Sequence, residues 1–461
     1  MMKPLFRRYA RLHLVGIGGV GMEGLAYVLQ AKGCQVSGSD RSPSRAVDQL
    51  RRAGIQVGGE HRAEQVQGCD LVVYSAAVPV DNVELVAAGQ LGIPVVGRAQ
   101  LLGELTRPYW TIAVAGSHGK TTTSAMMASI LRCAGSDASA LIGGWLEGKV
   151  AAWLGEGELF VVEADEYQRS FLQLRPQGAI VTTVDAEHLD CYRDLAEVED
   201  TFQLFLGALP FYGHCVMGAD DPGVRRLLPR MERPVLTYGL GSGNQVRAEE
   251  LQTHAWGSAF TVVGGTEEWG RVELRVPGLH NVRNALAAAA MAQLLEIDFA
   301  AVAEGLGSFS GVGRRFERRG ELQGILVVDD YAHHPAEITA TLEAARGTGR
   351  RVVAVFQPHL YSRTRALLRE FAQSLQAADQ VFLTAIYGAR EEAQADVDAG
   401  QIVQLMRVSG YQQVEYVPQL DDLPEKLLAS CRPGDLVLIM GAGDVDWVAD
   451  GLLAALGSKI G

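Results

Sequence analysis

Short apolar runs alternate with amphipathic stretches along most of this chain, and the alternation predicts strands and helices in turn. Near the N-terminus, the apolar run at residues 12–18 predicts a buried strand, and residues 21–33 predict the helix that follows it. The apolar runs at 71–78 and 93–97 predict further strands of the same unit. Strands that alternate with helices are typical of a parallel, doubly wound sheet. The pattern therefore predicts an α/β unit over residues 12 to about 106.

The same alternation restarts twice further along the chain. In the middle third it predicts strands and helices at residues 109–116, 121–135, 159–166 and 178–185, then an inserted or appended β-meander over 246–278 and a helix at 280–296. From about residue 311 it predicts strands separated by helices, at residues 325–335, 351–359, 380–386, 414–418 and 435–443. Polar clusters follow several of these strands, where parallel α/β sheets bind ligands.

The length of the chain supports this division. A chain of 461 residues is too long for a single hydrophobic core, and about 150 residues per domain suggests three domains. We predict domains at residues 1–107, 108–309 and 310–461, with Arg107-Pro108 as the first linker and a glycine-rich segment near the second boundary.

Composition and charge narrow the class of protein. Hydrophobic residues make up 48% of the chain and charged residues 21%, as in an ordinary globular protein. The formal net charge of −13 argues against a nucleic-acid binder that relies on a general basic field. The six cysteines show no CxxC spacing, and neither a signal peptide nor a membrane-spanning stretch is recognisable. We expect a reduced, cytoplasmic protein with no nucleic-acid partner and no membrane insertion.

The most informative chemical motif lies between a predicted strand and a predicted helix. In a phosphate loop, glycines let backbone N–H groups close on the phosphates, a lysine neutralises the outer phosphates and a hydroxyl binds Mg²⁺. Val114 stands where the usual pattern has its first glycine, and a glycine turn capped by threonines is the alternative interpretation. The Gly-Lys-Thr order favours a nucleotide, so we expect ATP. The candidate ATP-binding residues are Gly116, Ser117, His118, Gly119, Lys120, Thr121 and Thr122.

A second glycine motif opens the first predicted unit. It matches GxGxxG after a strand, and Asp40 ends the next strand, where an acid that binds a ribose would lie. The geometry suits NAD or any other diphosphate at a helix N-terminus, and a turn without a ligand is the alternative. The glycines of this motif are Gly16, Gly18, Gly19 and Gly21.

Acidic clusters follow two strands of the middle third. Hard oxygen ligands at these strand ends suit a metal ion beside ATP. A lone histidine is usually an ordinary surface residue, but His188 lies within an acidic cluster, which favours a metal ligand or an orienting group. The first cluster is Glu163, Asp165 and Glu166, and the second is Asp185, Glu187, His188 and Asp190.

The last third carries cationic side chains at predicted strand ends, in residues 314–317, 329–335 and 357–365. Arginines and histidines are rarely buried without partners, so these groups are suited to stabilise a phosphoryl group or to bind a carboxylate. A metal site formed by the paired histidines and aspartates is the alternative. Asn281, at the start of an alanine-rich helix, either caps that helix or approaches the adenine or the phosphates.

Taken together and in this order, the motifs resemble the Mur ligases of peptidoglycan synthesis. The segments that carry the resemblance are GIGGVGM, GSHGKTTT, EADE, HLD, HNVRNALAA, GVGRRFE, DDYAHHPAEI and FQPHLYSRT, and they span residues 16 to about 365. The resemblance implies a three-domain α/β fold: an N-terminal Rossmann-like UDP-binding domain, a central P-loop ATPase-like domain and a C-terminal Rossmann-like domain that binds an amino acid.

The resemblance also implies a reaction. It is closest to the members that join L-alanine to the lactyl carboxylate of UDP-N-acetylmuramate, with ATP and Mg²⁺. The carboxylate attacks the γ-phosphate to give an acyl phosphate and ADP, and the amine of L-alanine then forms the amide. The first glycine motif would therefore hold the uridine diphosphate rather than NAD.

Roles follow from matching the family's motifs to this chain. The resemblance implies a catalytic set of Lys120, Glu163, His188 and Arg315. It implies that Thr121, Glu163 and His188 bind Mg²⁺, and that Asn281, Arg315 and Asp330 complete the ATP site. It places Asp40 and Ser75 near the uridine, beside the first glycines. Our candidates for the amino-acid pocket are Tyr331, His333 and Arg363.

Two departures from the family's pattern concern the edges of the substrate pocket. The stretch that begins at Tyr167 replaces a Ser-Asp start, and Leu360 occupies a position that is often arginine. One rival interpretation is the murein-recycling Mur ligase that adds L-Ala-γ-D-Glu-meso-diaminopimelate, with which Tyr167 is compatible. Another is a non-catalytic regulator that binds a nucleotide or a UDP-sugar. We expect a monomer or a weak dimer.

Overall fold

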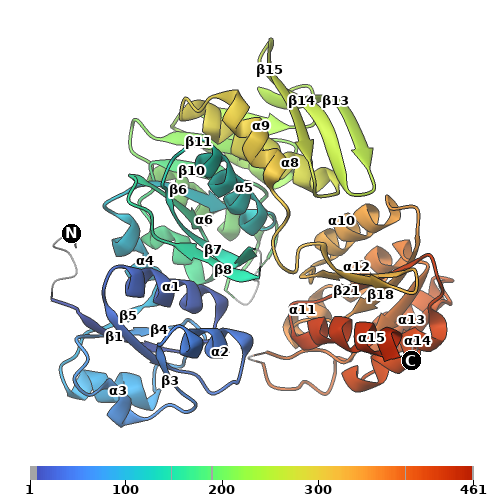
Figure 1. Ribbon diagram of the computed structural model, residues 1–461, viewed down its shortest axis with the longest axis horizontal. Coiled ribbons are helices and arrows are strands. Elements are labelled where there is room, and N and C mark those ends of the chain that lie inside the picture. The colour runs from blue at the N-terminus through green and yellow to red at the C-terminus, as the bar shows by residue number, and fades with distance from the viewer. Residues whose placement is uncertain (1–7, 147, 188–190, 390, 459–461) are drawn as a thin grey trace. The chain divides into compact units, whose positions relative to one another are not determined.

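The computed structural model describes residues 8–146, 148–187, 191–389 and 391–458, and the chain forms two compact units. The first unit comprises residues 1–247, 262–270 and 284–306, and the second comprises 248–261, 271–283 and 307–461. Strands within the described residues form three sheets, each flanked by helices (Figure 1). Short 3-10 helices occur along the chain between these elements. They are η2 (Ala63–Val66), η3 (Tyr167–Gln173), η4 (Leu228–Arg230), η5 (Leu375–Ala377), η6 (Leu420–Asp422) and η7 (Asp444–Asp446).

The N-terminal sheet has the strand order β3-β2-β1-β4-β5, and its paired strands are parallel. Its strands are β1 (Arg11–Val15), β2 (Gln35–Ser39), β3 (Gln56–Gly58), β4 (Leu71–Tyr74) and β5 (Val95–Gly97). The helices beside it are α1 (Val20–Ala31), α2 (Arg45–Arg52), α3 (Val83–Gln90) and α4 (Arg98–Thr106). The order reverses between β1 and β4, which places the first glycine motif at the topological switch point of a doubly wound sheet.

The central sheet has the order β15-β14-β13-β12-β11-β10-β6-β9-β7-β8. Its strands are β6 (Trp110–Ala115), β7 (Ser139–Leu146), β8 (Lys149–Trp153), β9 (Leu159–Glu163), β10 (Gly178–Val181), β11 (His214–Gly218), β12 (Val235–Gly239), β13 (Val246–His254), β14 (Gly257–Gly264) and β15 (Glu267–Leu274). Its helices are α5 (Lys120–Cys133), α6 (Leu195–Gly207), α7 (Pro222–Leu227), α8 (Leu279–Leu294) and α9 (Phe299–Ser308). The predicted meander is β13–β15 and extends this sheet, whereas the β7–β8 hairpin was not predicted.

The C-terminal sheet has the order β16-β17-β21-β18-β19-β20 and belongs to the second unit. Its strands are β16 (Glu317–Leu322), β17 (Ile325–Asp330), β18 (Arg351–Phe356), β19 (Gln380–Leu383), β20 (Val414–Tyr416) and β21 (Asp435–Met440). Its helices are α10 (Pro335–Arg346), α11 (Tyr361–Ala366), α12 (Leu368–Ser374), α13 (Gly400–Val408), α14 (Leu423–Ser430) and α15 (Trp447–Ser458). Strand β16 is an antiparallel edge strand of polar sequence, so it has no apolar run by which to predict it.

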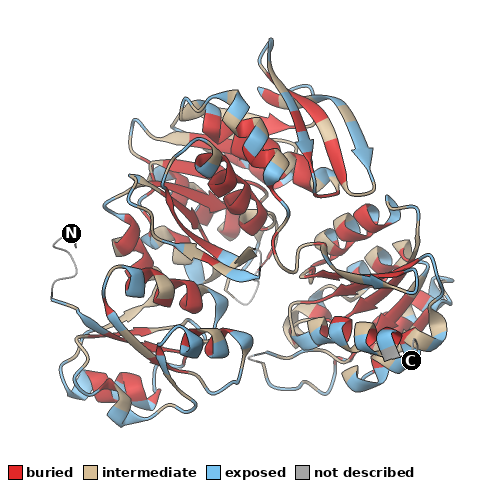
Figure 2. Cartoon of the chain, viewed as in Figure 1, coloured by how far each residue is buried: buried red, intermediate tan, exposed pale blue. Residues whose placement is uncertain are grey.

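The cores follow the apolar runs of the sequence. Strands β17 and β21 are buried along their whole length, and α5 is buried over most of its residues (Figure 2). In the first unit, α1 packs against β7 and β8, and Gly24 permits the approach because a Cβ there would lie 3.1 Å from Ala152 Cβ. Among the described helices, none has the length and apolar character needed to cross a membrane.

Candidate functional site

The glycine segment after β6 forms a tight loop that leads directly into α5. Its neighbours are fixed by strand register, since Val114 on β6 pairs with Glu163 at the end of β9, and Ala115 pairs with Val181 at the end of β10. The loop therefore lies at the carboxyl edge of the sheet. Val114 replaces the usual first glycine because it is still a buried residue of β6, not part of the loop.

Two glycines of this loop have backbone conformations that favour glycine. Gly116 has a φ of +135°, and a Cβ on it would lie 2.0 Å from Thr182 Oγ1. Gly119 has a φ of +85°, and a Cβ on it would lie 2.6 Å from Asn284 Oδ1. The close packing leaves no room for a side chain at either position. Asn284, on α8, is a neighbour of the loop that the sequence did not single out.

The loop is also braced against the end of β10. The N–H of Ser117 donates to Thr183 O at 2.9 Å, and the N–H of His118 donates to Thr183 Oγ1 at 2.9 Å. The hydroxyl of Ser117 accepts a hydrogen bond from the N–H of Asp185 at 2.9 Å. These bonds join the loop to the end of β10 and to the second acidic cluster.

Lys120 is the first residue of α5, and its ammonium group lies inside the loop. It donates to Gly116 O at 2.6 Å and to Ser117 O at 3.2 Å, and its Nζ lies 2.8 and 3.0 Å from the carboxylate oxygens of Glu166. Burial by itself favours the neutral amine, but the charges of Glu166, Asp165 and Glu163 outweigh it and raise the pKa of Lys120 above its usual value. The lysine is therefore a fixed cation.

Thr121 and Glu163 meet beside this cation. Thr121 Oγ1 donates to Glu163 Oε1 at 3.1 Å, and the N–H of Gly143 on β7 donates to Glu163 Oε2 at 2.8 Å. A hydroxyl and a carboxylate oxygen side by side at a strand end are ligands that Mg²⁺ prefers. The structure thus brings together the two described residues predicted to bind the metal.

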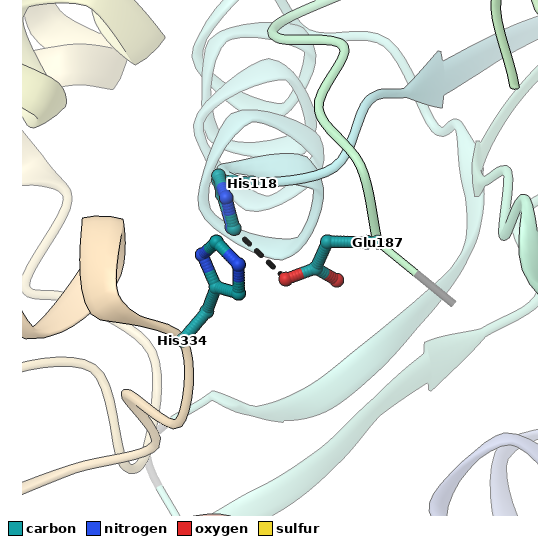
Figure 3. A group of neighbouring side chains, drawn as sticks. All are labelled: His118, Glu187 and His334. Atoms are coloured by element: carbon teal, nitrogen blue, oxygen red, sulfur yellow. Dashed lines mark ion pairs between the residues drawn. The ribbon is translucent and has the colours of Figure 1, made fainter. Parts of the chain in front are cut away.

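The imidazole of His118 faces the second acidic cluster. Its Nδ1 lies 3.9 Å from Glu187 Oε1, and its Nε2 lies 4.0 Å from Asp185 Oδ2. Figure 3 shows the imidazole and the Glu187 carboxylate directed at one another; His334, labelled in the same view, belongs to the second unit. The predicted metal ligand His188, like Asp190, lies outside the described residues.

The first glycine motif forms a second tight loop, between β1 and α1. The N–H of Gly16 donates to Ser39 O at 2.8 Å, and the N–H of Gly18 donates to Asp40 Oδ2 at 2.8 Å. A Cβ on Gly16 would lie 3.1 Å from Ser75 Cβ. Gly16, Gly18, Asp40 and Ser75 are thus neighbours, and Gly19 is the N-cap of α1. The Asp40 carboxylate shapes the loop itself.

Arg98 connects this loop to the acidic cluster after β9. Its Nη2 lies 3.8 Å from Asp165 Oδ2, and a Cβ on Gly21 would lie 2.8 Å from its Nη1. No motif in the sequence marks Arg98, which is the first residue of the short helix α4. Its position directly after β5, at a strand end where α/β sheets bind ligands, is the feature that could have identified it as a candidate.

The aspartates at the end of β17 are engaged by protein groups. Asp330 accepts hydrogen bonds from the N–H groups of Phe316 at 2.7 Å and Ala332 at 2.8 Å, and burial raises its pKa. Asp329 lies 3.3 Å from Arg314 Nε, and burial raises its pKa to about 7. Backbone N–H groups and an arginine thus hold both carboxylates in this arrangement.

Aromatic and cationic side chains gather beside these aspartates in the second unit. The guanidinium groups of Arg314 and Arg315 both lie 5.2 Å from the ring centroid of Tyr331. Arg315 also lies 3.8 Å from Glu337, whose carboxylate accepts hydrogen bonds from the N–H groups of both His333 and His334. The sharp turn before α10 is held by these bonds.

The candidate amino-acid residues form one ring cluster. The rings of Tyr331 and His333 are 5.3 Å apart, and those of His333 and His359 are 5.8 Å apart. Arg363 Nη1 lies 3.4 Å from His359 Nδ1, and Tyr387 stacks on His359 at 5.8 Å. Tyr387 was missed, since it lies in an irregular segment after β19.

Leu360 and Asn281 lie at or near the starts of helices. Leu360 has a φ of +70° and is buried, so a hydrophobic side chain occupies a strained position just before α11. Asn281 is the third residue of α8, and its amide donates to Pro277 O at 2.6 Å. The interpretation of Asn281 as the helix cap is therefore wrong.

Family models match three consecutive segments of the chain. They are the Mur ligase family, catalytic domain, at residues 11–110, the Mur ligase middle domain at 114–292, and the Mur ligase, glutamate ligase domain, at 314–443.

Similar proteins span nearly the whole chain. A UDP-N-acetylmuramate–L-alanine ligase from Salinibacter ruber is 45% identical over 451 residues, which cover 96% of this chain and 94% of the relative. One from Oleidesulfovibrio alaskensis is 47% identical over 438 residues, covering 94% of this chain and 96% of the relative.

Solved structures of similar proteins share the fold of this chain over nearly its whole length. A UDP-N-acetylmuramate–alanine ligase from Thermotoga maritima has a TM-score of 0.84 at 29% identity, covering 97% of this chain and 99% of that one. A murein peptide ligase from Psychrobacter arcticus has a TM-score of 0.74 at 27% identity, with the same coverage. The predicted three-domain α/β architecture is confirmed.

Proposed function

The chain belongs to the Mur ligase family, and from this premise we propose that it joins L-alanine to the lactyl carboxylate of UDP-N-acetylmuramate at the expense of ATP. Identity of 45% over almost the full length to a ligase named for these substrates supports the choice of substrates. The observation that carries the chemistry is the loop after β6, where Lys120 and the Thr121–Glu163 pair lie side by side.

In this proposal the loop of residues 116–122 receives the phosphates of ATP. Backbone N–H groups at the N-terminus of α5 favour anions, and Lys120 neutralises charge on the β- and γ-phosphates. In phosphoryl transfer the protein takes little part in covalent chemistry. These residues therefore act by positioning the phosphates and by neutralising their charge. The adenine and the remaining nucleotide contacts are assigned to Asn281, Arg315 and Asp330.

The donor set beside the loop fits a magnesium ion. Thr121 and Glu163 offer neighbouring oxygens, and we assign His188 to the same metal chemistry by family resemblance. The metal, when bound, would offset the negative charge of the phosphates. Gly143 N–H and strand pairing orient Glu163 for this role.

The reaction then has two steps. An oxygen of the lactyl carboxylate attacks the γ-phosphorus, the bond to the β-phosphate oxygen breaks, and ADP leaves with that electron pair. The neutral amine of L-alanine attacks the acyl carbon, the C–O bond to phosphate breaks, and the amine proton is lost as the amide forms. Water must be kept from the acyl phosphate, because hydrolysis would waste the ATP.

The two other substrates are assigned to separate loops. We propose that Gly16, Gly18, Gly19 and Gly21, with Asp40 and Ser75, hold the UDP part of the sugar nucleotide. Tyr331, His333 and Arg363 are assigned to L-alanine, with the Arg363 guanidinium paired to its carboxylate. We also propose the domain bounds 1–107, 108–309 and 310–461, a cytoplasmic location, and a monomer or weak dimer.

The test is phosphate release by the full chain with ATP, Mg²⁺ and UDP-N-acetylmuramate, with L-alanine or the tripeptide L-Ala-γ-D-Glu-meso-diaminopimelate added in parallel. Release with L-alanine, together with a product heavier by one alanyl residue, is the expected result. Phosphate release with the tripeptide alone would indicate that the protein is instead a murein-recycling ligase. No phosphate release with either L-alanine or the tripeptide would indicate a non-catalytic protein that binds a nucleotide or a UDP-sugar.

A further inference from the structure

The ammonium group of Lys120 is saturated by groups of the protein itself. An ammonium has three N–H donors. The acceptors around Nζ are Gly116 O at 2.6 Å, Ser117 O at 3.2 Å and the Glu166 carboxylate at 2.8 and 3.0 Å. A phosphate oxygen can take a hydrogen bond from this lysine only if one of these acceptors gives way.

Glu166 is the acceptor most easily exchanged. The two carbonyls belong to the backbone of the loop itself, so they can move away from the lysine only if the loop changes its conformation. The carboxylate, in contrast, is an anion with two equivalent oxygens, and it offers the lysine what a phosphate would offer. Its side chain is 1% exposed, so the pair is shielded from water and salt.

The backbone of Glu166 is anchored independently of its side chain. Its carbonyl accepts hydrogen bonds from the buried hydroxyl of Tyr192 at 2.5 Å and from the N–H of Arg169 at 2.9 Å. The following Gln168 and Arg169 both have left-handed backbones, with φ of 50° and 55°. This tight turn fixes the main chain, so the carboxylate can leave Lys120 by rotation of its own side chain.

We propose that Glu166 is an internal stand-in for phosphate, which holds Lys120 in the nucleotide-free protein and releases it when ATP binds. Glu166 is thus a positioning residue that acts through Lys120. It keeps the loop formed and its cation in place, but every binding event must break the pair, which weakens affinity for ATP. The inference rests on the proposed function only in taking ATP as the ligand.

The first test measures ATP affinity by titration calorimetry for the wild type and Glu166→Gln, without sugar nucleotide or amino acid. Glutamine lacks the negative charge that competes with the phosphates for Lys120. In the nucleotide-free variant the buried Lys120 ammonium therefore has no anionic partner at this position, and ATP should bind about tenfold more tightly, or about 1.4 kcal/mol. An unchanged or weaker affinity would overturn the proposal.

The matched control is Glu199→Gln. Glu199 lies on α6 in the same unit, is 11% exposed, and pairs at 2.6 Å with Arg226, which is 48% exposed. The substitution therefore makes the same Glu-to-Gln change in an ion pair away from the loop. Its ATP affinity should equal that of the wild type. Equal tightening in both variants would mean that a general loss of stability, not release of Lys120, is responsible, and would overturn the proposal.

A second test needs no variant and remains decisive if Glu166→Gln does not fold. A crystal structure of the wild type with ADP or a non-hydrolysable ATP analogue should show Lys120 Nζ on the phosphates and more than about 4 Å from Glu166, beyond ion-pair range. Persistence of the pair in that complex would overturn the proposal. A protein that binds ATP as expected but forms no amide would refute the proposed function and leave this inference standing.

Discussion

Replacing Lys120 with methionine should separate the catalytic role of this residue from its structural one. The substitution keeps a long side chain but removes the ammonium that faces Glu166 at 2.8 Å. Removing one partner of a buried ion pair costs about 3–5 kcal/mol, because the other charge stays buried and unpaired. Loss of one charge contact to a transferring group lowers kcat by about 10²–10³-fold. Lys120→Met should therefore be both less stable and nearly inactive.

The double variant Lys120→Met/Glu166→Gln distinguishes the two losses. It removes both charges, so most of the stability measured by urea unfolding should return, while phosphate release stays as low as in the single variant. UDP-N-acetylmuramate should still bind to both proteins, because the first glycine loop is built from other residues. Activity within tenfold of the wild type in Lys120→Met, or no recovery of stability in the double variant, would refute the reasoning.

Three further predictions concern the loop, the ring cluster and a buried aspartate. Gly116→Ala should abolish ATP binding in calorimetry, because its Cβ would lie 2.0 Å from Thr182 Oγ1; retained binding would contradict the packing. Arg363→Ala should raise the KM for L-alanine at least about tenfold and change the KM for ATP little, since one charge-assisted contact is lost. A raised KM for ATP with an unchanged KM for L-alanine would indicate that Arg363 contacts the nucleotide instead. Asp329 has a pKa raised from 3.8 to about 7, so the folded state binds more protons than the unfolded chain and stability falls as pH rises from about 4 to 7, by at most about 1.4 kcal/mol per unit. Urea unfolding of Asp329→Asn across this range should show a smaller decline, and an equal slope would exclude Asp329 as its source.

Much of the fold could be predicted because its strands are buried on both faces. Continuous apolar runs such as those of β6, β17 and β21 predict strands directly. Strand β16 and the β7–β8 hairpin were missed, since edge strands and hairpins bury only part of their surface and show no such run. Motifs placed the candidate residues at strand ends before any geometry was known.

The sequence by itself determined which groups are present and where along the chain: the glycines, Lys120, Thr121 and the acids that follow β9. The tertiary structure alone decided which of them meet. Register sets Glu163 opposite Val114, and thereby next to Thr121, while Glu166 rather than Asp165 pairs with Lys120. Strand order and register are non-local, arising from how sheets pack as a whole, so no pattern within one segment encodes them.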